Sequence, residues 1–424
     1  RFLMKESIFN SKIRLTDNLL AIYNALNDKT IFIAKNRVDI DDLSNSPALT
    51  LEQLKANGFV VEDSVDESRN YISYTRTVQN DTSAAHLIIN PTINCNFSCW
   101  YCYEQHTKSK MDEETINRVK RLVYRIMTEK KHLQFSFFGG EPLLYYKQVM
   151  LPILEYAGHL SEETGGTFHV NMTTNGSLLT PGRIEELKNY NFNGAQITLD
   201  GYKATHDRIR TPGNGKGSYD RIISNIHELV RNGVPATVRI NCTCENINDI
   251  HNITESFANL PKEQRSLLSF DFQTVWQEGN KSDISDRLNH IVREFVKQGL
   301  NAAKSSFREF CYADRRNSCV INYNGDLYKC TAIDFANTER DGYISEDGSL
   351  IWENGSLEKR LASKLKNKPC RACRILPLCH GGCTKNSLNA SDGYCMYNFD
   401  ERQIDQVVLD AIERNIQFGR TNKL

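Results

Sequence analysis

Three cysteines, Cys95, Cys99 and Cys102, follow one another in the spacing CxxxCxxC. With 13 cysteines in 424 residues, this spacing arises by chance in on the order of 1% of such chains. Three thiolates on one short loop can hold three irons of a [4Fe–4S] cluster and leave the fourth iron open. Zinc is the alternative, but structural zinc normally takes four ligands in paired CxxC spacings. The spacing therefore favours an iron–sulfur cluster with an open iron.

A second group of cysteines lies between positions 311 and 395. It combines C-x13-G-x4-C, Cx2Cx5CxxxC and one later cysteine, and its members are Cys311, Cys319, Cys330, Cys370, Cys373, Cys379, Cys383 and Cys395. Eight thiolates suffice for two fully ligated [4Fe–4S] clusters, with a pair of zinc ribbons as the alternative. If Cys319 is a bystander, one cluster has an open iron. The odd cysteine count and the absence of a visible signal peptide favour metal over disulfides.

The composition excludes several classes of protein. Lys+Arg and Asp+Glu both number 52, so the net charge is zero and bulk charge does not bind the chain to nucleic acid or a membrane surface. No apolar run reaches the roughly 18 residues that a membrane span needs. We therefore expect a globular protein without nucleic-acid or membrane partners.

The elements that must position these cysteines alternate regularly from about residue 84 to 300. The pattern predicts strands at His86–Ile89, Leu133–Phe138, Phe168–Thr174, Ala195–Leu199, Ala236–Cys244 and Leu268–Val275, with helices at about 112–131, 146–161, 181–190, 218–232, 247–259 and 284–299. Six βα units in a row predict a parallel sheet, either doubly wound or rolled into a partial barrel. Folds of this kind carry their chemistry at the carboxyl ends of the strands.

The flanking regions differ from this core. Residues 1–80 predict strands at Ser7–Leu15, Leu19–Tyr23 and Thr30–Ala34 and helices at Val38–Leu43 and Leu51–Asn57, a small α/β or winged-helix-like binding module. The acidic stretch 62–70 reads as a hinge. Residues 301–400 are the cysteine-rich domain, and residues 401–424 are a C-terminal helix with Ile404, Val407, Val408, Ala411, Ile412 and Ile416 on its apolar face.

Further polar and glycine-rich motifs follow the predicted strands. They are Gly139-Gly140-Glu141-Pro142, Thr174-Asn175-Gly176, Thr198-Leu199-Asp200-Gly201 and His206-Asp207-Arg208-Ile209-Arg210. A Gly-Gly pair lets the backbone approach a ligand closely, although it is more often only a turn. Arg210 can anchor a carboxylate through two parallel hydrogen bonds, although a loop arginine is usually just solvated.

Together these motifs resemble the radical S-adenosylmethionine (SAM) enzymes over residues 84–300. The resemblance implies a partial (β/α)6 TIM-like barrel whose Cys95, Cys99 and Cys102 hold the cluster that binds SAM. Gly139, Gly140 and Glu141 match the GGEP motif that meets the SAM amino group. Tyr101 is the aromatic residue before the last cysteine, and Thr198 and Arg210 match the family's SAM-contacting hydroxyl and arginine. The implied chemistry is reductive cleavage of SAM to a 5′-deoxyadenosyl radical that abstracts hydrogen from a substrate.

The second group of cysteines resembles the SPASM domain of the same superfamily. The resemblance implies one auxiliary cluster on Cys311, Cys319, Cys330 and Cys383 and another on Cys370, Cys373, Cys379 and Cys395. The chain would then bind SAM and three [4Fe–4S] clusters, receive electrons from a low-potential donor such as flavodoxin or ferredoxin, and work in an oxygen-free cytoplasm.

SPASM enzymes that resemble this chain mostly modify peptides. With its N-terminal module, the chain is similar to maturases of ribosomally made (RiPP) peptides that form a thioether or carbon–carbon crosslink. The alternatives are an anaerobic sulfatase maturase that makes formylglycine, and a non-catalytic electron-transfer or zinc-organised scaffold. The sulfatase maturases carry an aspartate where this chain has Thr331. No catalytic acid or base is assigned, although Glu104, Tyr312 and Asp334 are candidates near the site. For Cys242 and Cys244 we expect packing in the hydrophobic core.

Overall fold

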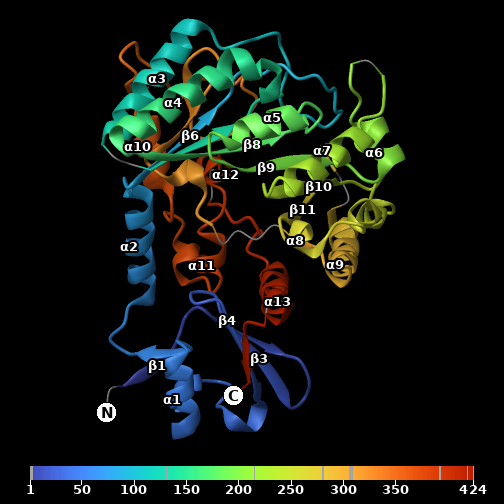
Figure 1. Ribbon diagram of the computed structural model, residues 1–424. Helices are drawn as coiled ribbons and strands as arrows, with labels where there is room; N and C mark the ends of the chain where they lie inside the picture. Colours follow the sequence, from blue (N-terminus) through green and yellow to red (C-terminus); the bar gives the residue numbers. More distant parts are fainter. Residues whose placement is uncertain are drawn as a thin grey trace. The chain divides into compact units, whose positions relative to one another are not determined.

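The computed structural model describes residues 3–129, 132–213, 215–278, 281–304, 309–390, 393–417 and 419–423. The chain divides into two compact units (Figure 1). Unit 1 contains residues 1–80, 306–315 and 358–424, and unit 2 contains residues 81–305 and 316–357. Within the described ranges, no helix is both long and apolar enough to span a bilayer.

Unit 2 is built on one large sheet in the order β12-β11-β10-β9-β8-β7-β6-β13-β14-β15-β16. Strands β6 to β12 run parallel, β13 pairs parallel with β6, and β14 to β16 continue antiparallel. The bounds are β6 Ala84–Ile89, β7 His132–Phe137, β8 Thr167–Thr174, β9 Phe192–Leu199, β10 Ala236–Cys242, β11 Leu268–Thr274, β12 Asn301–Lys304, β13 Ser318–Ile321, β14 Asp326–Tyr328, β15 Gly342–Ile344 and β16 Leu350–Trp352.

The predicted α/β fold is confirmed, because this sheet is large, mostly parallel and consistent with a partial barrel. All six predicted strands are present. Strand β10 is shorter than expected and ends at Cys242, so the alternation that would place Cys244 on the same face stops there. The short strand β12 was not predicted, since its four residues carry too little pattern to separate it from the following loop.

Helices cover the sheet of unit 2. Their bounds are α3 Glu113–Thr128, α4 Leu151–Thr164, α5 Pro181–Lys188, α6 Lys203–Ile209, α7 Tyr219–Arg231, α8 Lys262–Arg265 and α9 Lys281–Lys297. Two segments predicted as α-helix adopt other helical forms. Residues Tyr146–Met150 form a π-helix ahead of α4, and Ile250–Phe257 form a 3₁₀-helix. The Asp112 side chain accepts a hydrogen bond from the Thr115 N–H and so caps α3.

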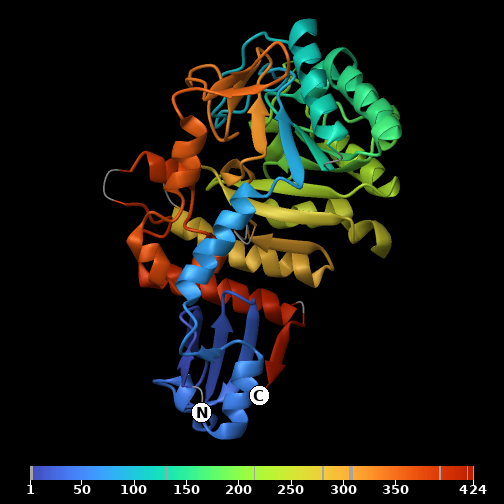
Figure 2. The same cartoon turned by 90° about the vertical axis from the view of Figure 1, so that its left-hand side faces the viewer.

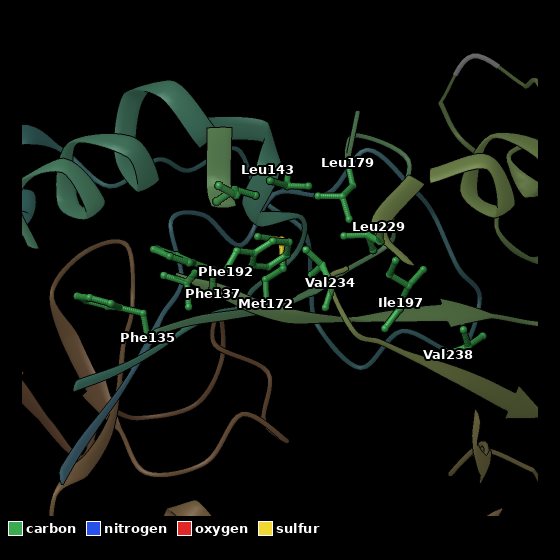
Figure 3. Packing of buried hydrophobic residues seen from close by; sticks show 14 of the residues in the cluster. Phe135, Phe137, Leu143, Met172, Leu179, Phe192, Ile197, Leu229, Val234 and Val238 are labelled. Atoms are coloured by element: carbon green, nitrogen blue, oxygen red, sulfur yellow. The ribbon is translucent and has the colours of Figure 1, made fainter. Parts of the chain in front are cut away.

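Alternation along the strands builds the core of unit 2. Figure 3 shows Phe137 of β7, Met172 of β8, Ile197 of β9 and Val238 of β10, which are buried on the face that the helices cover. Each such side chain contributes up to about 1.5–3 kcal/mol by leaving water. The opposite face of the strands carries the polar residues, so the core fixes the register that carries those residues to the carboxyl edge.

Unit 1 contains a four-stranded sheet in the order β17-β4-β3-β2 and a separate pair β1-β5. The bounds are β1 Met4–Glu6, β2 Asn10–Arg14, β3 Leu19–Asn24, β4 Lys29–Ala34, β5 Val60–Glu62 and β17 Thr421–Lys423. Figure 2 shows β17, from the far end of the chain, alongside the N-terminal strands, where it pairs parallel with β4. The predicted three N-terminal strands are therefore present, and a segment from residues 421–423 extends their sheet.

The helices of unit 1 correct three expectations. Their bounds are α1 Ala48–Ala56, α2 Glu67–Asn80, α11 Leu376–Cys379, α12 Thr384–Leu388 and α13 Glu401–Gln417, and α10 Ser356–Ser363 begins just before the unit boundary. The predicted helix at 38–43 is wrong: the segment is irregular between the 3₁₀-helices Lys35–Arg37 and Leu43–Asn45. The predicted hinge at 62–70 is also wrong, because it holds the start of α2. Helix α13 ends at Gln417, and Ile416 is exposed.

One hydrophobic core joins the N-terminal strands to the cysteine-rich segment inside unit 1. Phe9, Tyr23, Tyr71, Leu376 and Val408 are all buried in it, and two cysteines of the segment pack against its rim. The other face of the β2–β4 sheet packs on α1 in a core of its own. The N-terminal module is thus not tethered to the cysteine-rich segment by a flexible link. It forms one packed body with that segment.

Candidate active site at the carboxyl edge of the large sheet

The predicted cofactor residues of unit 2 lie along one edge of the large sheet. The loop that contains Cys95 follows β6, Gly139 follows β7, Asn175 follows β8, and Asp200 follows β9. Because these strands are parallel neighbours, their carboxyl ends meet at the same edge. The structure therefore brings together the four motifs that the sequence separates by about a hundred residues.

The three thiols of the CxxxCxxC loop lie close enough to affect one another's ionisation. Burial, followed by the charge of Glu141, raises the pKa of Cys95 to about 12, and Cys99 contributes. Burial also raises the pKa of Cys99, with Cys102 among the contributing charges. A positive metal centre would favour the thiolate forms and release the protons of these thiols. Across the described ranges, no three His, Cys or acidic side chains are grouped to hold a single metal ion.

The two glycines after β7 pack directly against the cysteine loop. A Cβ atom on Gly139 would lie 2.3 Å from the backbone oxygen of Thr92, and one on Gly140 would lie 2.3 Å from that of Asn94. Gly139 also has φ +97°, which side chains rarely tolerate. Only glycine permits this close packing of the turn after β7 against the backbone of the cysteine loop.

Glu141 is fully buried and its carboxylate is occupied by internal hydrogen bonds. It accepts from the Thr174 hydroxyl at 2.8 and 2.9 Å, from the Asn175 N–H at 2.8 Å and from the Leu143 N–H at 3.1 Å. Burial raises the pKa of Glu141, and these hydrogen bonds oppose the shift. The side chain thus locks the ends of β7 and β8 together, and only its backbone is left to contact a ligand.

Four side chains form a partly buried network beside the cysteine loop. The Tyr101 hydroxyl donates to Oδ2 of Asp200 at 2.6 Å and accepts from Arg210 at 2.7 Å and from Asn241 at 3.0 Å. Arg210 also pairs with Oδ2 of Asp200 at 3.2 Å. Burial raises the pKa of Asp200, and the positive charge of Arg210 acts in the opposite direction. The network joins residues from β9, β10, the cysteine loop and the end of α6.

Two buried polar atoms of this network have no partner among the described residues. They are Nε of Arg210 and Oδ1 of Asp200. A buried guanidinium N–H without a partner is costly, and a carboxylate is the group that satisfies it best. The donor set therefore fits the carboxylate of an amino acid, and the glycine cradle fits its ammonium. Both groups are present in SAM.

Sequence reasoning missed two members of this network. Asp200 was noted only as a member of the motif Thr198-Leu199-Asp200-Gly201, with no role assigned, and Asn241 gave no signal beyond its place near the end of β10. Thr198, which was predicted, is a buried residue of β9, and Asp200 follows the end of that strand. Its contact with SAM stays a prediction.

A second loop is tied to the cysteine loop within unit 2. The Tyr103 hydroxyl donates to the Thr331 oxygen at 3.0 Å, and the Gln105 N–H donates to Asp334 at 3.0 Å. Between these contacts lies Glu104, whose Oε2 is buried and has no partner in the described part of the chain. Burial raises the pKa of Glu104 to about 7. Tyr312, the other named candidate, belongs to unit 1.

Four cysteines of unit 1 line a common cavity of about 270 Å³: Cys370, Cys373, Cys379 and Cys395. Burial raises the pKa of Cys379 to about 12, and the charges of the other three thiols contribute. The Asn367 amide donates to the Cys370 sulfur at 3.3 Å and to the Tyr394 oxygen at 3.0 Å, which holds the ends of the segment together. These are the four residues that the resemblance assigns to one auxiliary cluster, and their donor set fits one.

The remaining cysteines do not form a described group. Cys311 and Cys383 belong to unit 1, whereas Cys319 and Cys330 belong to unit 2, so their shared cluster stays a prediction. Cys319 is 1% exposed and packs in the apolar core of unit 2, in register with Leu87. Its burial favours the bystander interpretation. Cys242 is buried in the same core, as predicted, whereas Cys244 is exposed, so the prediction of core packing is wrong for Cys244.

The fold and the carboxyl-edge site define a class of enzyme. Residues 89–257 match the family model of the radical SAM superfamily. The chain therefore carries a radical SAM domain over these residues and is an enzyme. Members of that superfamily use SAM and a [4Fe–4S] cluster. The recognition from the motifs is confirmed, and the non-catalytic scaffold is no longer an alternative.

Two of the proteins to which the chain is similar over most of its length are maturases. The chain is 26% identical over 336 residues to a cysteine-type anaerobic sulfatase-maturating enzyme of Clostridium novyi, covering 71% of this chain and 88% of that protein. It is 24% identical to the mycofactocin maturase MftC of Mycolicibacterium smegmatis, covering 69% of this chain and 76% of that protein.

Solved structures show the same fold. Native anSMEcpe with bound AdoMet superposes with a TM-score of 0.60 and 17% identity, covering 79% of this chain and 99% of that one. Streptococcus suis SuiB bound to its precursor peptide SuiA superposes with a TM-score of 0.53 and 14% identity, covering 92% and 97%.

Proposed function

We propose that this enzyme is a peptide maturase that abstracts hydrogen from a ribosomally made precursor peptide and forms a thioether or carbon–carbon crosslink in it. The observation that carries the proposal is the packed body of unit 1, in which a sheet of the N-terminal module shares its core with the cysteine-rich segment. The edge of such a sheet can pair with an extended peptide through main-chain hydrogen bonds. The fold likeness to peptide-bound SuiB, which extends over 92% of this chain, supports the proposal.

Within this function, the carboxyl edge of unit 2 is the radical-generating site. Cys95, Cys99 and Cys102 would hold the cluster, and the backbone of Gly139 and Gly140 would accept hydrogen bonds from the SAM ammonium. When bound, the cluster and SAM supply the radical that removes a hydrogen atom from the substrate. The chain itself binds and orients SAM and the substrate, and it excludes water from the site.

The network beside the cysteine loop would orient the rest of SAM. Arg210 is held by Asp200 and Tyr101, so its head group is fixed before SAM arrives. Its Nε–H, which has no partner among the described residues, is left to donate to a carboxylate. Thr198 and the Tyr101 ring are the further contacts that we propose. Because the arginine is already ordered, little side-chain entropy is lost when the ligand binds.

We also propose two auxiliary [4Fe–4S] clusters, which bring the total to three. The four-thiol cavity of unit 1 supports the one on Cys370, Cys373, Cys379 and Cys395. The other would take Cys311, Cys330 and Cys383, with Cys319 as the fourth ligand or as a core residue. A flavodoxin or ferredoxin would supply the electrons, and an oxygen-free cytoplasm is the compartment that such clusters require.

A second candidate function is anaerobic sulfatase maturation, favoured by the 26% identity to the Clostridium novyi enzyme. Against it stand the N-terminal module and Thr331, which occupies the place of that family's aspartate after Cys330. The main-chain carbonyl of Thr331 accepts a hydrogen bond from the Tyr103 hydroxyl.

A competition assay separates the two functions. The reconstituted enzyme receives SAM, a reductant and equal amounts of two peptides: one encoded by a small reading frame beside its gene, and one carrying the cysteine motif of a sulfatase. Crosslinking predicts loss of two hydrogen atoms from the precursor with the sulfatase peptide unchanged. Conversion of the cysteine in the sulfatase peptide to formylglycine, in which sulfur and two hydrogen atoms are lost and one oxygen is gained, would reject the proposal if the precursor stays unchanged.

A further inference from the structure

Tyr71, in the middle of α2, contacts the turn that carries Cys379. Its hydroxyl and Nδ1 of His380 lie 2.5 Å apart in a hydrogen bond, and the two rings stack with centroids 6.3 Å apart. Tyr71 is 3% exposed and His380 is 8% exposed, so water does not compete for this bond. His380 directly follows Cys379, one of the four thiols of the unit 1 cavity. The N-terminal module therefore reaches a residue bonded to a proposed cluster ligand.

The backbone of His380 is held in an uncommon conformation. Its φ is +49°, in the left-handed region that residues other than glycine rarely enter. The ring has two aromatic neighbours, Tyr71 with a centroid separation of 6.3 Å and Phe310 with one of 4.2 Å. Such a conformation persists only where the surroundings over-determine it. The clamp on the ring thus fixes the backbone of the turn that continues through Gly381 and Gly382 along the cavity wall.

Helix α2 connects this clamp to the sheet of the N-terminal module. At its first residue, Glu67 accepts hydrogen bonds from the Ser7 hydroxyl at 2.7 Å and from the Ile8 N–H at 2.9 Å. One turn later, the Tyr71 ring packs edge-on against Phe9 at 5.9 Å. A rigid helix fastened at both places transmits a displacement of the N-terminal strands to His380.

We propose that Tyr71 is a positioning residue for the auxiliary cluster in the unit 1 cavity, and that the N-terminal module acts on this cluster through the Tyr71–His380 contact. The inference rests on the proposed function in taking the cavity to hold an iron–sulfur cluster and the module to bind a peptide. Groups around a ligand orient it and tune the metal it holds. A peptide that docks on the N-terminal strands then alters the cluster from a distance, because α2 moves the turn that carries Cys379.

The test uses the full chain with Cys95→Ala, Cys99→Ala and Cys102→Ala, so that the auxiliary clusters alone contribute signals. Tyr71→Phe keeps the ring and removes the hydroxyl. Tyr74→Phe is the matched control, because it makes the same change one turn along α2 at a side chain that is 54% exposed. The readouts are the rate at which EDTA removes iron and the electron paramagnetic resonance spectrum after reduction.

We expect Tyr71→Phe to shift the spectrum and to lose iron about two- to tenfold faster, as loss of one buried hydrogen bond implies. Tyr74→Phe should match the parent. A Tyr71→Phe protein whose spectrum and iron loss equal those of Tyr74→Phe would overturn the proposal.

A second variant covers the case in which Tyr71→Phe does not fold. His380→Asn tolerates the left-handed backbone and removes the ring, and it should reproduce the spectral shift. In the double variant, Tyr71→Phe should add nothing further, whereas additive effects would mean that the two residues do not act on the cluster together. A parent without auxiliary iron would reject the cluster assignment itself. If only the role of the Tyr71–His380 contact is refuted, the enzyme with its intact triad still crosslinks the precursor. If the proposed function is wrong, that enzyme does not crosslink it, so the two failures can be distinguished.

Discussion

The two cysteine sites of this enzyme are built in opposite ways. The triad Cys95, Cys99 and Cys102 sits on one short loop, and neighbouring parallel strands deliver everything else it needs to the same edge. The four thiols of the unit 1 cavity come from loops and a single turn of helix, and an N-terminal sheet supplies part of the core behind them. The first site is encoded locally and supported by the fold. The ligands of the second lie within residues 370–395, but the N-terminal segment completes the core that supports them, so the site depends on packing far from its ligands.

The largest expected effect breaks the local site. Cys95→Ala, Cys99→Ala and Cys102→Ala together should abolish SAM cleavage, because no other cysteine lies on that loop. Iron content should fall by about one third, since the auxiliary ligands lie elsewhere in the chain. Anaerobic iron and sulfide analysis with a 5′-deoxyadenosine assay checks both. Cys244→Ala, at an exposed cysteine, is the control. Continued formation of 5′-deoxyadenosine by the triple variant would contradict the assignment.

The next effect weakens the four-thiol site of unit 1 without changing any of its ligands. Phe9→Ala should destabilise unit 1 by about 3–5 kcal/mol, because a fully buried aromatic ring leaves a cavity in the core shared with the cysteine segment. Auxiliary iron should be lost more readily, with the triad cluster retained. Chemical denaturation and iron analysis measure the two effects. Leu26→Ala, at a residue 52% exposed in the same module, should change neither. Loss of both kinds of cluster in Phe9→Ala would remove the distinction between the sites.

A single methyl group tests how tightly the local site is packed. Gly140→Ala places a Cβ atom 2.3 Å from the Asn94 oxygen, and overpacking of this kind costs about 1–3 kcal/mol. SAM affinity should therefore fall by about tenfold to a hundredfold. Gly182→Ala is matched to it, since a Cβ atom there meets nothing within 4 Å. Anaerobic titration with SAM compares the two. Equal affinities in both variants would show that the backbone at Gly140 does not contact SAM.

The smallest effect is a pH dependence in unit 2. His206 is fully buried, and burial, aided by Arg210, lowers its pKa well below the ordinary value. The unfolded chain therefore binds a proton that the folded chain excludes. Stability should be unaffected by this residue above about pH 6.5 and should fall by up to about 1.4 kcal/mol per pH unit as the pH drops below it. His206→Asn should flatten that slope between pH 7 and 5 in thermal unfolding. An unchanged slope would mean that His206 is protonated in the native state.

The sequence predicted most of unit 2 because its patterns are local. The stripe on α3 and the alternation in β7 each fix an element within one window of the chain, and parallel pairing then brings the strand ends together. The CxxxCxxC and Gly139-Gly140 motifs were readable for the same reason. Asn241 was not, because its value comes from a hydrogen bond to Tyr101, 140 residues away in sequence.

Unit 1 was less predictable because its structure depends on contacts between distant segments. The acidic stretch read as a hinge contains Glu67, whose carboxylate is buried against Ser7 and Ile8. A charge that accepts two buried hydrogen bonds looks, in sequence, the same as a solvated one. The pairing of β17 with β4 and the contact of Tyr71 with His380 likewise leave no local signal.

The most direct test of the central claim follows a hydrogen atom. The reconstituted enzyme is incubated with SAM, a reductant and the candidate precursor peptide, deuterated at the carbons of its core residues. The account predicts that deuterium appears in 5′-deoxyadenosine and that the peptide loses two hydrogen atoms as the crosslink forms. Cleavage of SAM that yields only unlabelled 5′-deoxyadenosine, with the peptide unchanged, would contradict the account.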